Sequence, residues 1–425
     1  MIAGARGDNA IPYGIPMRYL LTGAAALALA WTTIALRPEL LTGQHAVPAA
    51  LAVTHLLTLA FATLILLGAM HQLVPVLLVT KLHAPRLGDV SFALVAPGAA
   101  AIVLGFAFGY RVPLLAAGGT AVLAGLLLFD YNLLRTFLAA RRRDAVSVAM
   151  LCSALYLTLT ALLGLLIALR AVVPGLAGVL GYATPLHLGL GLMGAFGVAI
   201  AGAGHRLLSM FVLSHGVSRA RLAWLLWSVG AALAALTLQT FAGWPLAPLA
   251  ALLALAAGVL FVLDVVAILR MRLRRRIEAP MATYLAGPAF LVVAAVAALD
   301  GRPDVAVMAV LVGFVTLAIA GMLVKIAAFL TWQHRFAARV GQGAVPLVKD
   351  LTRSELEVAT TVGLGLGAAT ACATAFWSSP VLAGVAGVTG AIGAWALALH
   401  LAWIVVAPHA ATPASNPATP LGGTP

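Results

Sequence analysis

The stretch LHLGLGLMGAFGVAIAGAGHRLLSMFVLSH, residues 186–215, is apolar enough to cross a lipid bilayer, yet it carries His187, His205 and His215. A run of about 20 apolar residues has the length of a transmembrane helix. Ionisable side chains are costly inside lipid, and where they occur they usually mark a functional site. The segment therefore predicts a membrane span whose histidines have a functional role.

The rest of the chain has the same character. Of its 425 residues, 63% are hydrophobic and 9% are charged, whereas a soluble domain is about half apolar and a quarter charged. The composition predicts an all-α polytopic membrane protein whose solvent is the lipid bilayer. Apolar runs place twelve spans at roughly 17–36, 49–72, 90–110, 113–134, 146–169, 185–206, 220–241, 246–269, 282–299, 305–330, 357–376 and 382–406.

The net charge of +13 is distributed unevenly. If the N-terminus is cytoplasmic, all but four of the 25 Lys and Arg residues fall on the inner side or at inner span ends. This asymmetry predicts cytoplasmic termini and a bacterial-type inner membrane. The runs RRRD (141–144) and RMRLRRR (270–276) lack interleaved aromatic residues, so we expect them to touch lipid headgroups and not nucleic acid.

Polar residues recur at a fixed interval along the chain. An offset of 134 residues places His71 on His205 and also Asp130 on Asp264. A third copy follows, because VKIAAFLTWQH (324–334) aligns with HRLLSMFVLSH (205–215). The recurrence predicts three four-helix repeats of about 17–143, 146–276 and 282–406, within one domain over 1–408. The Pro- and Thr-rich segment 409–425 is expected to be a disordered tail.

The histidines of spans 2 and 6 lie at two levels. His55 and His187 lie near the outer ends of their spans, and His71 and His205 lie 16 and 18 residues further in, which is about 24–27 Å along a helix. The inner pair fits interfacial residues that hydrogen-bond water, with a cytoplasmic metal or proton-entry site as the alternative. His71 and His205, with His187, are thus candidate metal ligands.

The outer pair carries the sharper hypothesis. Gly191, Gly194 and Gly202 share a helix face with His187. Such a stripe of small residues admits either a close neighbouring helix or a flat ligand such as haem. Imidazole also binds copper. Helix packing, haem or metal ligation and proton relay all stay open for His55 and His187.

Two aspartates and one more histidine lie late in apolar spans. Asp130 and Asp264 are candidates for a proton or ion route, and so is His400, which takes the corresponding place in the third repeat. The alternative is local pairing with an arginine a few residues further on, Arg135 or Arg270.

This plan resembles a known family. Twelve spans in three four-helix units, with THLLTLAFATLILLGAMHQLVPVLL (54–78) and the stretch quoted above, resemble divergent relatives of heme–copper oxidase subunit I. That superfamily includes the nitric oxide reductase large subunit, and NnrS-like proteins are similar to it. The resemblance implies His55 as a low-spin haem ligand and His187 as a copper ligand, with other respiratory membrane subunits as partners.

The chain also departs from the family pattern. Residues 220–241 contain no histidine pair for copper, and span 10 begins PDVAVMAVLV (303–312), without haem-ligating histidines. An offset of 119 between spans 6 and 10 brings Met308 opposite His55 as a substitute axial ligand. We therefore do not expect an oxygen or nitric oxide reductase.

Two functions of different classes follow from these residues. The first is a haem-binding protein, with copper as a further cofactor, that serves electron transfer, sensing, or nitric oxide or metal homeostasis. The second is a proton-coupled secondary transporter of a metal ion or small solute. Parallel repeats occur in both classes.

Overall fold

A computed structural model describes residues 11–43, 46–141 and 143–407. Within these ranges the chain is helix, turn and loop, with two isolated β-bridges and no strand. Twelve helices are long and apolar enough to span a membrane, and they coincide with the twelve predicted spans. Helices are expected there because lipid offers no partner to an unpaired backbone group. The tail 409–425 and His409 lie outside the described residues.

The elements are, in chain order, α1 (Gly14–Leu36), η1 (Pro38–Leu41), α2 (Pro48–His55), η2 (Leu56–Thr63), α3 (Leu64–Leu78), α4 (Pro85–Ala107), α5 (Val112–Ala139), α6 (Ala145–Leu169), α7 (Pro174–Val179), α8 (Thr184–Leu188), η3 (Gly189–Gly197), α9 (Val198–Phe211), α10 (Ala220–Ala242), α11 (Ala247–Arg270), α12 (Ala279–Leu299), α13 (Pro303–Met308), η4 (Ala309–Val315), α14 (Thr316–Arg335), η5 (Ala337–Arg339), η6 (Val348–Leu351), α15 (Ser354–Trp377) and α16 (Pro380–Val406).

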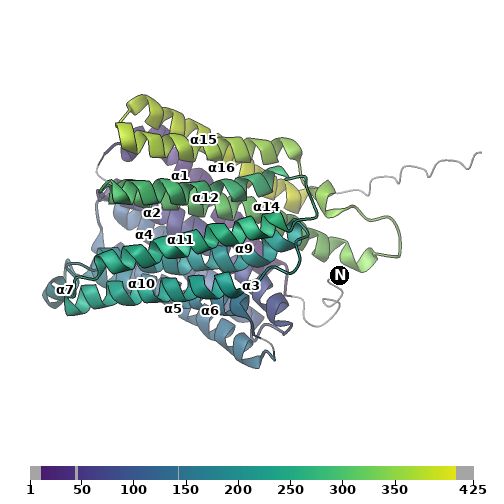
Figure 1. The fold of residues 1–425 in the computed structure, drawn as a ribbon, viewed down its shortest axis with the longest axis horizontal. Coiled ribbons are helices and arrows are strands. Elements are labelled where there is room, and N and C mark those ends of the chain that lie inside the picture. The colour runs from purple at the N-terminus through teal and green to yellow at the C-terminus, as the bar shows by residue number, and fades with distance from the viewer. Residues whose placement is uncertain (1–10, 44–45, 142, 408–425) are drawn as a thin grey trace, which may run out of the picture.

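Three spans form the centre of the bundle. Pro48–Leu78, Thr184–Phe211 and Pro303–Arg335 are the second, sixth and tenth spans, and 67%, 61% and 83% of their most apolar stretches are buried. No other span exceeds 56% among the described residues. The remaining helices, such as α10, α11 and α15, run alongside on the outside of the bundle (Figure 1). The residues singled out on spans 2 and 6 therefore lie on interior helices.

Each central span changes its helical register near its start. The segments η2, η3 and η4 are π-helical, and they begin just after His55, His187 and Met308. η4 packs against both η2 and η3. A π-helical turn carries an extra residue and displaces the neighbouring side chains, and such turns are frequent at functional sites. The three register changes thus meet in the middle of the bundle.

The two ends of the bundle differ in charge. The arginine-rich end, defined here by the loops 140–144, 212–219 and 271–278, is held together by a bridge between Ser214 and Arg272 and by the Arg274 amide, which donates to the Val212 carbonyl at 3.1 Å. The opposite end, called the α7 end, carries α7 on the left of Figure 1. The cytoplasmic location of the arginine-rich end stays a prediction.

Candidate functional site

His55 and His187 line one cavity of about 190 Å³. His55 is the last residue of α2, and His187 lies in the short helix α8. Helices α4, α5 and α6 supply nearly half of the remaining wall, and the three π-helical segments also contribute, η4 through Leu311. Two histidines from corresponding places of spans 2 and 6 therefore share one site.

Hydrogen bonds fix both rings. His55 Nδ1 lies 2.8 Å from the Leu51 carbonyl oxygen, and His187 Nδ1 lies 3.1 Å from the Thr160 carbonyl oxygen. A carbonyl only accepts hydrogen bonds, so each Nδ1 carries the proton and each Nε2 keeps its lone pair. Histidines that bind a metal usually donate the other ring N–H in this way. Both rings are therefore prepared as Nε2 donors.

Close packing orients the same two rings. His55 stacks on Phe106, with 4.7 Å between ring centroids and 25° between planes. His187 lies against Gly164, where an added methyl group would come within 2.8 Å of the His187 Cε1 atom. A glycine on α6 is therefore the only residue that leaves room for His187 in this position without displacement.

The deep part of the cavity holds a free hydroxyl. Thr54, Thr58 and Thr160 line the cavity but donate to carbonyls four residues earlier in their own helices. Thr63 is the last residue of the π-helical segment η2, is fully buried, and its Oγ1 has no hydrogen-bond partner within the described part of the chain. Of the threonines that line the cavity, Thr63 is the one whose buried hydroxyl has no partner in the described part of the chain.

The cavity is too small for haem as it stands. Pockets for drug-sized ligands measure about 300–1,000 Å³, and a porphyrin exceeds most such ligands. Met308, the expected second axial ligand, is buried. Among the described residues, Val307 and Leu311 line the cavity and Met308 does not. The cavity accommodates a metal ion with a small ligand, and we derive no step through haem.

A second hollow, of about 410 Å³, adjoins this cavity and shares Leu188, Leu192 and Val307 with it. Alanine and glycine residues of α11 and apolar residues of α10 and η4 line it. Among the described residues its lining includes one sulfur donor, Met193, but no histidine, so the smaller cavity with its two imidazoles is the candidate site.

The structure does not assemble the candidate metal set of His187, His71 and His205. The described residues contain no group of three or more His, Cys, Asp or Glu side chains that could hold a metal ion. His71 is 1% exposed, its Nδ1 donates to the Leu67 carbonyl at 2.7 Å, and it packs against Tyr19 and Phe129.

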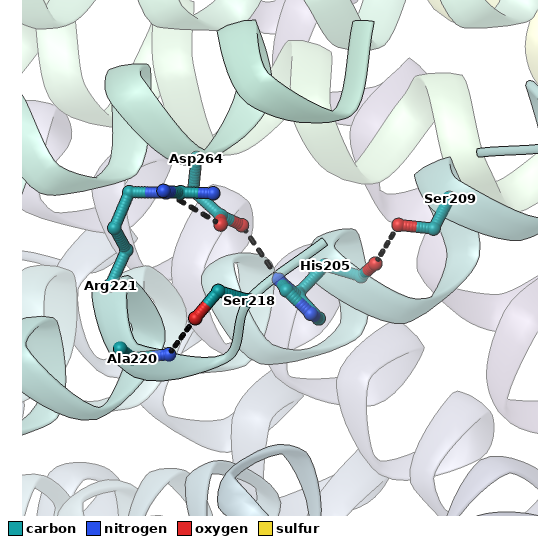
Figure 2. Close-up of polar contacts among 6 residues, drawn as sticks. All are labelled: His205, Ser209, Ser218, Ala220, Arg221 and Asp264. Atoms are coloured by element: carbon teal, nitrogen blue, oxygen red, sulfur yellow. Dashed lines mark hydrogen bonds and ion pairs between the residues drawn. The ribbon is translucent and has the colours of Figure 1, made fainter. Parts of the chain in front are cut away.

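His205 instead meets Asp264. His205 Nδ1 lies 2.8 Å from Asp264 Oδ2, and Arg221 Nε donates to Asp264 Oδ1 at 3.3 Å (Figure 2). Helices α9, α10 and α11 thus contribute one residue each to a buried charged cluster. The expected alternative, a local pair with Arg270, is not the contact that Asp264 makes here.

Asp130 and His400 have different surroundings. Thr158 donates to Asp130 Oδ2 at 2.6 Å, while Asp130 Oδ1 is buried without a partner among the described residues. Arg135 lies over the Tyr131 ring and not at Asp130. His400 Nε2 accepts the Arg353 backbone N–H at 2.9 Å, which anchors the start of α15. His400 therefore has a structural contact, and Asp130 stays a candidate for a proton route.

Sequence reasoning missed Arg221, Thr63 and Thr160. Arg221 was counted only as one of many basic residues at span ends, although a charge at the start of an apolar run is a signal. Thr63 and Thr160 carry no such signal, because their roles depend on the π-helical register and on the packing of α6.

No protein-family model and no curated protein sequence matches this chain.

Proposed function

We propose that this chain is a multi-pass membrane protein that binds one copper ion, as Cu(I), between Nε2 of His55 and Nε2 of His187, in electron transfer or metal homeostasis. The observation that carries the proposal is the shared cavity, in which both imidazoles donate Nδ1–H to backbone carbonyls. A bound Cu(I) would supply a one-electron redox couple or a transferable cargo.

The donor set favours Cu(I) over other ions. Calcium and magnesium prefer oxygen ligands, and structural zinc takes four ligands. Two neutral imidazoles form a short, nitrogen-only set, and imidazole suits copper. Cu(I) accepts two-coordinate binding, and a monovalent ion costs less than a divalent one to bury in an apolar surrounding. The ion is therefore expected to be monovalent.

We also infer that the twelve spans are three repeats of about 17–143, 146–276 and 282–406, on the plan of heme–copper oxidase subunit I. Support comes from the three π-helical segments, which begin at corresponding places on the three most buried spans. The proposed likeness extends to the plan and to His187 as a copper ligand, but not to a haem at His55.

The test is copper binding by purified protein under anaerobic, reducing conditions. Wild-type protein should hold about one copper per chain, and His55→Ala and His187→Ala should each lose it. The exposed His215 provides the control, because His215→Ala removes an imidazole outside the cavity. Loss of copper from all three variants, or a haem absorption band in place of copper, would refute the proposal.

A second candidate is a proton-coupled transporter of a metal ion or small solute. The buried His205–Asp264 contact favours it, because such pairs carry protons in transporters. Reconstituted liposomes distinguish the two functions. Copper uptake driven by a proton gradient and lost in His205→Gln indicates transport, whereas bound copper without uptake indicates a resident site.

A further inference from the structure

The charged cluster gives one carboxylate two hydrogen-bond donors, His205 and the cation Arg221. Asp264 uses Oδ2 for His205 and Oδ1 for Arg221, at 2.8 and 3.3 Å (Figure 2). The His205 and Asp264 side chains are 7% and 9% exposed, whereas Arg221 is 30% exposed. With Arg221 as its one cation, the Asp264 carboxylate forms a neutral site. If His205 also carried a positive charge, the buried site would have a net charge of one.

The tautomer of His205 leaves a place for a proton. Arginine is always protonated in proteins, and the Arg221 guanidinium donates to Asp264 Oδ1. The carboxylate therefore accepts Nδ1–H from His205, and Nε2 retains its lone pair. In Figure 2 this second nitrogen points away from Asp264.

Arg221 is the partner that can leave. It is the second residue of α10, directly after the loop 212–219, and its side chain is the most exposed of the three in the cluster. The preceding Arg219 already reaches outward, to Asp144 on the neighbouring loop at 3.0 Å. A side chain at this helix start can move into solvent without breaking the helix.

The other ionisable groups around His205 are accounted for. Tyr284 on α12 places its hydroxyl against Gly204, and that hydroxyl has no hydrogen-bond partner in the described residues. Lys325 on α14 pairs with Glu278. Asp264 and Arg221 are therefore the charges that respond to a proton on His205.

We propose that His205 is a proton-binding site open to the arginine-rich end, and that a proton on Nε2 replaces Arg221 as the counter-ion of Asp264. One N–H bond forms at Nε2 as one O–H bond of a hydronium ion breaks and leaves water, and Arg221 moves away with its own protons. Uptake of a proton thus loosens the start of α10. The proposal is independent of copper in the histidine cavity.

A spin label on Ala220→Cys, an exposed position next to Arg221, reports this movement once Cys152 and Cys372 are replaced by alanine. In the otherwise unchanged chain the mobile fraction of the label should rise severalfold between about pH 8 and about pH 5, the range over which histidine titrates. With His205→Gln the label should stay immobile at both values.

Two further variants make the result decisive. Arg221→Gln removes the released group, so the label should be mobile at both pH values. His400→Gln alters another buried histidine, one that contacts α15, and should leave the pH response intact. A label that does not respond to pH, or that responds equally with His205→Gln, overturns the proposal.

Discussion

His187 and Gly164 are in contact across α6 and α8, because a methyl group at residue 164 would lie 2.8 Å from His187 Cε1 and 3.3 Å from Nδ1. Gly164→Ala must therefore turn the imidazole away from the Thr160 carbonyl. Loss of an interaction that orients a metal ligand costs about 10–100-fold in affinity. We expect a loss of this size in Cu(I) affinity, measured by competition with a chelator.

Gly119 offers the matched control. It also lines the cavity, but a methyl group there would meet the flexible end of Leu165. Gly119→Ala should leave Cu(I) affinity within a few-fold of wild type. Equal losses in both variants would mean that cavity volume, and not the orientation of His187, controls binding.

Thr63 and Thr158 are buried threonines with opposite expectations. Thr63→Val removes a hydroxyl without a hydrogen-bond partner in the described structure, so we expect unchanged or slightly higher thermal stability. Thr158→Val removes the hydroxyl that donates to Asp130 Oδ2. We expect it to lower the free energy of unfolding by about 1–3 kcal/mol. Thermal unfolding in detergent compares the two, and a larger loss for Thr63→Val would contradict this description of the cavity.

Asp264→Asn should destabilise the protein strongly. It leaves Arg221 and His205 without their shared carboxylate, and breaking a buried ion pair costs about 3–5 kcal/mol. Asp89→Asn is the comparison, because its pair with Arg18 has 40% and 44% of the two side chains exposed. Exposed pairs contribute about 0–1 kcal/mol. Similar unfolding temperatures for the two variants would count against a buried cluster.

Gly321 marks a close approach of α14 to α12. A methyl group there would lie 2.5 Å from the Pro280 carbonyl oxygen and the Tyr284 amide nitrogen, both backbone atoms that cannot yield easily. We expect Gly321→Ala to cost about 1–3 kcal/mol, in the range of overpacked cores. Gly258→Ala, with no described atom within 4 Å, should be close to neutral in the same thermal assay.

The twelve spans were predictable because apolar length alone defines a transmembrane helix. That His55 and His187 lie at the same depth along their spans was predictable from their positions in two similar segments. The fixed tautomer of His187 was not, since the Thr160 carbonyl comes from another helix.

Register changes explain the remaining differences. The offset pointed to Met308, but the wall of the cavity is made by Val307 and Leu311, on either side of it, where η4 begins. No pattern in the sequence announces a π-helical turn. The pairing of Asp264 with Arg221 likewise depends on how α10 and α11 pack. The sequence alone suggested Arg270, because it is close to Asp264 along the chain.

X-ray absorption spectroscopy of the copper-loaded protein tests the central proposal most directly. We expect the spectrum of wild-type protein to show Cu(I) coordinated by two imidazole nitrogens. That signal should be lost when both His55 and His187 are replaced by alanine. Sulfur neighbours around the copper, or the same two-nitrogen spectrum in the double variant, would contradict it.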